Sequence, residues 1–328
     1  MPVYNAGKTL EAAIVSILTQ DFGDFEFVII DDASKDNSTE MIRSYAKQDS
    51  RVKPVFHQEN AGVSATLNEG VTIAKAPYVA RMDADDESLP GRLGMQYIFI
   101  RNRPSVAAAG SFVYYMGVTP KLDRLFRVPV SSAEINKKLE DENCIYHPSV
   151  IMNRALVLRA GGYRKEFKNS EDYDLWLRLH QSHELANIPI PLLRYNFTVD
   201  GMSLGRKWEQ LYYVYLAKVA FRNAGKPWAE IEQIAKDQHS RHKKDIFLHD
   251  VLLGTLNELL NLGRADEARQ LTERFSGDLG PEKAAQIFRR AALCEDPQPS
   301  DGAGWLEEFM TLRHEQRPDQ QTPTSKTL

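Results

Sequence analysis

Carboxylate side chains gather at two places in this sequence where they could hold a cation. Asp31 and Asp32 end one short apolar run, and Asp83, Asp85 and Asp86 end another. Like charges at one sheet edge are costly unless a cation or hydrogen-bond donors lie among them, so a divalent metal is an economical partner. A few carboxylates together with a diphosphate suit Mg²⁺ or Mn²⁺. These acids are therefore candidate metal ligands.

Asp83 and Asp85 are the sharper pair of candidates. They are two residues apart, so in an extended segment they project to the same side. One could then bind the ion and the other a sugar hydroxyl. The alternative is that acids at strand ends cap turns and helices, and this applies to Asp36 and Asp86 in particular.

A glycine-bearing stretch, Asn60-Ala61-Gly62-Val63-Ser64, precedes a predicted helix. Its backbone N–H groups could bind a phosphate. The stretch lacks the G-x-G-x-x-G spacing and the Walker lysine-serine pattern, which disfavours dinucleotide-binding and P-loop sites. Alternatively, Ser64 caps an ordinary helix.

The elements that must position these residues follow an α/β pattern. In the first hundred residues the apolar spacing predicts helices at 9–18, 38–46 and 64–74, and strands at 25–30, 52–57 and 78–82. This alternation predicts a doubly wound, mostly parallel sheet, whose ligands bind at the carboxyl ends of the strands. Further strands are predicted at 106–115, 149–152 and 188–195, further helices at 132–139, 154–160 and 171–183, and a loop at 121–129.

The pattern becomes helical after the sheet residues. Five helices are predicted at 208–223, 228–238, 246–262, 265–275 and 282–293. We therefore divide the chain into an α/β domain at 1–204, a helical region at 205–295 and a tail at 296–328 predicted to be disordered. Aromatic residues near Lys207 and Lys218 would suit an interface or a membrane surface, or else form helical core: Trp208, Tyr212, Tyr213 and Tyr215.

Composition excludes several classes of protein. The 328 residues carry a formal net charge of −4, which argues against nucleic acid as a partner. The two cysteines, Cys144 and Cys294, allow neither a disulfide framework nor a cysteine-rich zinc site, and both are expected to be small core residues. No signal peptide or membrane span is evident, so we expect a protein that is free in the cytoplasm or peripheral on the inner face of the cell membrane.

Five short motifs occur in one order along the first half of the chain. They are Pro2-Val3-Tyr4-Asn5, Val28-Ile29-Ile30-Asp31-Asp32-Ala33-Ser34, Asn60-Ala61-Gly62 with Asn68-Glu69-Gly70, Asp83-Ala84-Asp85-Asp86, and Ser170-Glu171-Asp172-Tyr173-Asp174-Leu175-Trp176. As an ordered set over roughly residues 1–200 they resemble family 2 glycosyltransferases of the GT-A fold, in particular the bacterial members that build surface polysaccharides.

The resemblance implies a site for a nucleotide-diphosphate sugar. Its donor-binding positions correspond to Pro2, Tyr4, Asn5, Asp32, Asn60, Gly62 and Asp83. Asp83 and Asp85 match the D-x-D pair that holds Mn²⁺ or Mg²⁺ together with the donor's ribose and diphosphate.

The resemblance also implies the catalytic side of that site. Glu171 and Asp172 match an E-D pair whose Asp is the general base, and the start of a helix would keep Asp172 ionised. The alternative for Asp172 is a helix-terminal acid without a catalytic role. His147 precedes the acceptor-side loop and is expected to be mainly structural, with a contact to the acceptor as the alternative.

Three departures from the family pattern matter. The first strand, which should precede Pro2, is missing, and this predicts a native start upstream of Met1. The Q-x-x-R-W motif of processive synthases is absent, which predicts the addition of one sugar. No His precedes Ser203, so the residues that cover the diphosphate stay open, with Ser203, Arg206 and Lys207 as candidates.

We therefore expect an inverting, metal-dependent glycosyltransferase. It would move one sugar to a hydroxyl of a glycan or lipid-linked acceptor, and its helical region could also serve acceptor binding, membrane contact or a homodimer. A second hypothesis is an inactive nucleotide-sugar-binding or scaffold protein that acts through its C-terminal helices. A third hypothesis is a sugar-1-phosphate nucleotidyltransferase. The glycine-rich first loop expected of such an enzyme is not seen in this sequence.

Overall fold

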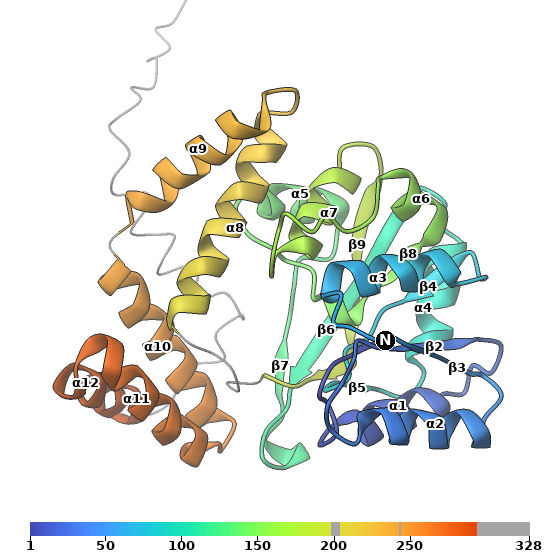
Figure 1. The fold of residues 1–328 in the computed structure, drawn as a ribbon, viewed down its shortest axis with the longest axis horizontal. Coiled ribbons are helices and arrows are strands. Elements are labelled where there is room, and N and C mark those ends of the chain that lie inside the picture. The colour runs from blue at the N-terminus through green and yellow to red at the C-terminus, as the bar shows by residue number, and fades with distance from the viewer. Residues whose placement is uncertain (198–203, 243, 294–328) are drawn as a thin grey trace, which may run out of the picture.

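A three-stranded parallel sheet forms the amino-terminal end of the molecule. The computed structural model describes residues 1–197, 204–242 and 244–293. The strands are β1 (Pro2–Val3), β2 (Phe27–Asp31) and β3 (Val52–Phe56), in that order. Helices α1 (Leu10–Leu18) and α2 (Ser38–Gln48) lie on one face and α3 (Val63–Ile73) on the other (Figure 1). Burial on both faces explains why β2 is a continuous apolar run.

A second, mixed sheet continues the fold in the order β4-β8-β6-β9-β5, with β7 paired to β6. Its strands are β4 (Tyr78–Ala80), β5 (Glu87–Ser88), β6 (Val106–Tyr115), β7 (Arg124–Phe126), β8 (Ile151–Asn153) and β9 (Glu184–Tyr195). Among the strand pairs of this second sheet that the structure describes, only β6 and β9 are parallel. Its helices are α4 (Arg92–Arg101), α5 (Ser132–Leu139), α6 (Arg154–Arg159) and α7 (Glu171–Leu179), with 3₁₀ turns η1 (Pro120–Leu122) and η2 (His147–Ser149).

The alternating α/β pattern is confirmed, with three differences. The parallel arrangement predicted from the first hundred residues is confined to the first sheet and to the β6–β9 pair. The segment 121–129, which was expected to be a loop, contains strand β7, and β7 pairs with β6. The first strand was expected to be missing, but Pro2 and Val3 form a short strand, β1, and pair with Ile30 and Asp31 of β2.

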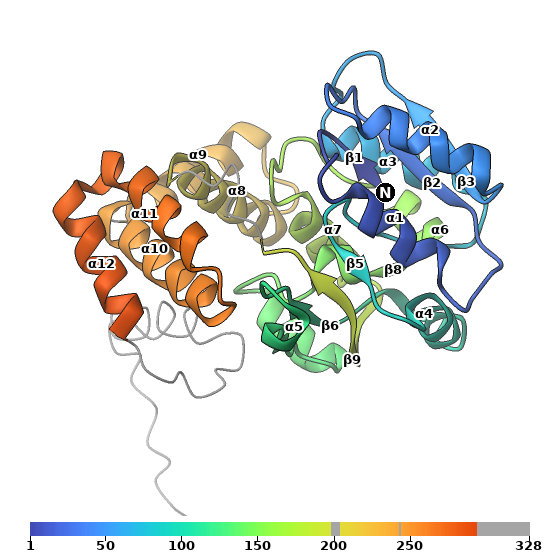
Figure 2. The same cartoon turned by 90° about the horizontal axis from the view of Figure 1, so that it is seen from below.

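Five helices of the described chain follow the sheets: α8 (Leu204–Arg222), α9 (Trp228–Ser240), α10 (Lys244–Asn261), α11 (Ala265–Leu279) and α12 (Pro281–Leu293). They extend to one side of the sheets in both views (Figures 1 and 2). Trp208 packs on His239, with ring centroids 4.2 Å apart, and Tyr215 is buried. For these two aromatic residues, the prediction that they form helical core is therefore confirmed.

Several predictions from the sequence fall outside the described residues. They are the disordered tail, Ser203, Cys294 and the side chain of Arg206. Cys144 is described and is a buried core residue, as expected. Within the described ranges, we find no helix with the length and apolar character that crossing a bilayer requires.

Candidate active site

Three carboxylates follow β4 and lie close together. Candidate ligand atoms of Asp83, Asp85 and Asp86 are all within 4.8 Å of one another. The sequence analysis assumed an extended segment, but the chain turns at Ala84–Asp85, and this turn is what brings the three side chains together. The capping alternative for Asp86 is wrong, because its Oδ1 accepts the N–H of Asn196 at 2.7 Å, far along the chain.

The electrostatics of this cluster favour a cation. Burial and the charge of Asp83 raise the pKa of Asp85 to about 6, and burial raises that of Asp86 well above its usual range. Oδ2 of Asp86 is buried without a hydrogen-bond partner among the described residues. A buried carboxylate oxygen with nothing to bind is costly, and a divalent cation would satisfy it. The residues present therefore fit Mg²⁺ or Mn²⁺.

Arg81 is a candidate functional residue that the sequence analysis missed. It is 7% exposed, and its guanidinium donates to Asp83 Oδ2 at 2.6 Å. Its signal was its position two residues before Asp83, which places both on one side of the chain. The guanidinium of Arg81 already forms an ion pair with Asp83. Asp85 and Asp86 are therefore the two carboxylates of the cluster for which the described residues show no ion pair.

Glu171 and Asp172 open helix α7, as predicted. Oδ1 of Asp172 accepts the N–H of Tyr173 and Oδ2 accepts the side-chain amide of Asn143, each at 2.7 Å. Burial raises the pKa of Asp172, against the effect expected from the helix start. Burial and the charge of Asp172 raise the pKa of Glu171 to about 7.

A pocket of about 410 Å³ joins the acidic cluster to this pair. Asp83, Glu171 and Asp172 all line it, and so do Arg81 and Asn143. Aromatic and basic side chains line it as well: Tyr115, Tyr146, Tyr195 and Arg127. Asp85 lines a separate hollow of about 360 Å³ together with Arg264, so the helical region forms part of its wall. Asp83 and the Glu171–Asp172 pair, which lie about ninety positions apart in the sequence, thus line the same pocket of about 410 Å³.

His147 also reaches this pocket but is held inside the protein. Its Nε2 lies 2.9 Å from the Tyr163 hydroxyl, and its ring packs against Trp176. Burial lowers the pKa of His147 well below its usual range. This environment suits the structural role expected for it.

Hydrogen bonds link the loops at the carboxyl end of the parallel strands. Asn5, at a positive φ of 52°, accepts the N–H of Lys35 at 2.7 Å, which joins the loops after β1 and β2. Thr9 donates to the carbonyl of Ala84 at 3.0 Å and so joins the β1 loop to the acidic cluster. Asp36 accepts the N–H of Gly7 at 2.8 Å, which fits the interpretation of Asp36 as a structural acid.

Asp32 is already engaged inside the protein. Its Oδ1 lies 2.7 Å from His57 Nδ1 and accepts the N–H of Ala61, while Oδ2 accepts the N–H of Gly62. These two backbone donors therefore point at Asp32, and not outward toward a phosphate as the sequence analysis considered. The cap expected at Ser64 is also wrong, because α3 begins after Gly62.

The other predicted donor residues occupy varied surroundings. Tyr4 is 53% exposed, and Asn60 donates to the carbonyl of Asp32 at 3.2 Å. Pro2 is half-buried in β1. Lys207 contacts Gln210 on its own helix. The structure gathers these donor candidates, apart from Lys207, at one sheet edge but brings none of them into the pocket with Asp172.

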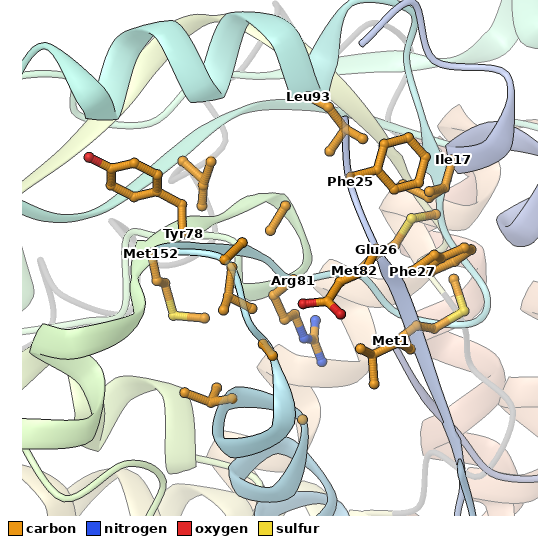
Figure 3. A pocket seen from close by; sticks show the side chains of 18 of the residues that line it. Met1, Ile17, Phe25, Glu26, Phe27, Tyr78, Arg81, Met82, Leu93 and Met152 are labelled. Atoms are coloured by element: carbon orange, nitrogen blue, oxygen red, sulfur yellow. Dashed lines mark hydrogen bonds between the residues drawn. The ribbon is translucent and has the colours of Figure 1, made fainter. Parts of the chain in front are cut away.

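A larger pocket, of about 500 Å³, lies between the two sheets (Figure 3). Its labelled side chains are mostly apolar, including Phe27, Met82 and Met152, and Arg81 points into it (Figure 3). It is lined by none of the acidic cluster and neither residue of the Glu171–Asp172 pair. It is therefore not the pocket that we consider as the candidate active site, although Arg81 lines both.

Comparison with known proteins identifies the family of this chain. The profile described as Glycosyl transferase family 2 matches residues 1–161. An uncharacterised glycosyltransferase of Methanocaldococcus jannaschii is 30% identical over 228 residues, which cover 68% of this chain and 78% of the relative. The chain belongs to glycosyl transferase family 2. As a member of this family it is a glycosyltransferase, and the resemblance inferred from the ordered motifs is confirmed.

Two bacterial relatives have more specific names. The O-antigen biosynthesis glycosyltransferase WbnJ of Escherichia coli is 34% identical over 55% of this chain and 69% of its own length. The amylovoran biosynthesis glycosyltransferase AmsE of Erwinia amylovora is 28% identical over 68% of this chain and 85% of its own length.

Solved structures of glycosyltransferases share the fold. A mannosyltransferase of Pyrobaculum calidifontis, in complex with GDP-Man and Mn²⁺, aligns with a TM-score of 0.54 at 17% identity, over 96% of this chain and 86% of its own. S. aureus TarS in complex with UDP-GlcNAc aligns with a TM-score of 0.54 at 16% identity, over 89% and 90%. The GT-A fold of this family 2 member is thereby established.

Proposed function

We propose that this glycosyltransferase moves one sugar, with inversion, from a nucleotide-diphosphate sugar to a hydroxyl of a glycan or lipid-linked acceptor. The observation that carries the proposal is the pocket of about 410 Å³ that Asp83 of the acidic cluster shares with the Glu171–Asp172 pair. Asp83 brings the cluster of candidate cation ligands to this pocket, and the Glu171–Asp172 pair brings a proton acceptor. Transfer of a sugar to a hydroxyl needs both.

In the proposed mechanism the acidic cluster holds the donor end. Asp85 and Asp86 are the ligands we assign to Mg²⁺ or Mn²⁺, with Asp83 shared between that ion, Arg81 and the donor ribose. A cation held there would neutralise the charge that develops on the departing diphosphate. Arg81 adds a fixed positive charge, because it is buried beside Asp83.

Asp172 is the proposed general base. The acceptor hydroxyl gives its proton to Asp172, and its oxygen forms a bond to the anomeric carbon. The bond between that carbon and the diphosphate oxygen breaks on the opposite face, and the nucleotide diphosphate leaves with the electron pair. Attack opposite the leaving group inverts the anomeric centre.

The biological setting is proposed from the relatives. Proteins named for O-antigen and amylovoran biosynthesis are among them, which supports a role in the synthesis of bacterial surface polysaccharide. UDP-GlcNAc and GDP-Man occur in the structural neighbours, so both nucleotides belong in the first donor screen. The absence of a Q-x-x-R-W motif supports the addition of a single sugar.

A donor screen tests the proposal. We expect release of nucleoside diphosphate from one sugar nucleotide in a panel, loss of that release in EDTA, and recovery with Mn²⁺ or Mg²⁺. Asp85→Ala should abolish release while the protein stays folded, and Asp21→Ala, which alters an exposed acid outside the site, serves as the control. Full activity in metal-free buffer would refute the metal, and no release from any donor would favour the scaffold hypothesis.

A further inference from the structure

We propose that Asn143 is a positioning residue that holds the Asp172 carboxylate ready to accept the acceptor's proton. This inference rests on the proposed function, because it assigns a partner to the proposed base. Asn143 lies in the segment between α5 and η2, and it lines the same pocket as Asp172. Its amide nitrogen lies 2.7 Å from Asp172 Oδ2.

The orientation of the Asn143 amide is fixed by a second contact. Its Oδ1 accepts the backbone N–H of Ile145 at 3.2 Å. Ile145 is 2% exposed, so this contact is anchored in the core. With the oxygen committed to Ile145, the NH₂ group faces Asp172, and only a donor is presented to the carboxylate.

Asp172 is held at both oxygens, whereas its neighbour is not. Oδ1 accepts the N–H of Tyr173, and the Tyr173 hydroxyl is tied to the carbonyl of Leu139 at 2.6 Å. Glu171 Oε2 is buried and has no hydrogen-bond partner among the described residues. Donors stabilise the ionised form of a carboxylate, so the proton shared by this adjacent pair is placed on Glu171. Asp172 then remains free to take the acceptor's proton.

The other charged groups around Asp172 are largely paired with one another. Arg81 is bound to Asp83, and it lowers the pKa of Asp172 from a distance. Lys138 and Glu142 of the α5 side form an ion pair at 2.8 Å. His147 stays neutral, because burial lowers its pKa well below the usual range. Within the described ranges, Asn143 is therefore the side chain that donates a hydrogen bond to Asp172 and can directly favour its ionised form.

The test is the pH dependence of turnover in variants of Asn143. For Asn143→Ala we expect kcat to fall by about tenfold or more, with the donor KM nearly unchanged. The acid limb of the kcat profile should move up by about one pH unit, since Asp172 loses a donor to its charged form. Asn143→Asp keeps the size, replaces the donor with a like charge and should shift the limb further. Asn102→Ala, at the exposed end of α4, is the matched control.

The outcomes separate this inference from the proposed function. A wild-type acid limb and kcat in both Asn143 variants, with Asp172→Asn inactive, would overturn the role of Asn143 alone. Near-normal turnover in Asp172→Asn would instead overturn the proposed base. In an Asp172→Asn background, Asn143→Ala should bring no further loss of residual turnover. A second full loss there would mean that Asn143 acts through another group.

Discussion

At the scale of single residues, Asp172 carries the sharpest prediction. Asp172→Asn keeps the size of the side chain and removes the proton acceptor. We expect kcat to fall by roughly 10²–10⁴-fold, the usual contribution of a positioned base. Donor affinity should persist, because the cation and nucleotide contacts we assign lie on other residues. Sugar transfer and donor binding measured on the same sample decide the question, and a helix-terminal acid without a catalytic role would leave turnover intact.

Glu171 gives a prediction about stability and pH. Its pKa is raised from 4.5 to about 7 in the folded protein, so the folded state holds its proton more tightly than the unfolded state does. The contribution of this group is therefore present below pH 4.5 and is lost as the pH rises toward 7.

Glu171→Gln replaces the ionisable carboxyl with a neutral amide, so the variant does not lose this stability as the pH rises. The variant should match the native protein in stability near pH 4.5 and exceed it by about 1–3 kcal/mol at pH 8. Urea unfolding at the two pH values measures the difference. Equal stability of the two proteins at pH 8 would show that the carboxyl is not strained by its burial.

The residues of the site could be predicted from the sequence only in part. Asp83, Asp85 and Asp172 were found because ordered motifs mark them. Arg81 was missed although its partner Asp83 lies only two residues away. Asn143 was missed because its contact with Asp172 is made across the fold. An exposed Asn in a loop gives no sign that its amide will meet a carboxylate from a distant helix.

At the scale of elements, the predictable parts are those whose own residues decide their form. The ten residues of β6 are apolar enough to be predicted with their full bounds. Strands β5 and β7 have two and three residues, and their form depends on pairing with β9 and β6. A pattern along the chain cannot show a partner that arrives from elsewhere.

Asp32 provides the prediction at this scale, because it ties strand β2 to the start of helix α3. Asp32→Asn replaces one acceptor oxygen with an NH₂ group, which faces a backbone N–H donor or His57. We expect a loss of about 1–3 kcal/mol in unfolding free energy, the cost of unpaired buried donors. Asp24→Asn, at an exposed position between α1 and β2, is the control. Full stability with donor affinity abolished would instead assign Asp32 to direct contact with the nucleotide.

At the scale of the whole molecule, the helical region contacts the sheets in two ways. Helix α8 shares an apolar core with α7, while α10 meets the β6–β7 hairpin through polar contacts. Arg124 of β7 donates to both oxygens of Glu258, at 3.0 and 3.2 Å. Their side chains are only 21% and 16% exposed, so this ion pair is screened less by water than a surface pair.

A double-mutant cycle measures how much this docking contributes. Arg124→Gln and Glu258→Gln each leave a half-buried charge without its partner, so each should destabilise the protein. Because the double variant leaves no such charge, it should be less destabilised than the sum of the two, with a coupling of about 1–3 kcal/mol. The exposed pair Lys226–Glu230 within the helical region is the control, with an expected coupling below about 0.5 kcal/mol. Equal coupling in both cycles would mean that the α10 contact does not dock the helices. The position of Arg264 beside the hollow lined by Asp85 would then depend on the remaining contacts, which include the apolar α7–α8 core and the hydrogen bond from the N–H of Val118 to the carbonyl of Leu262 at 3.0 Å.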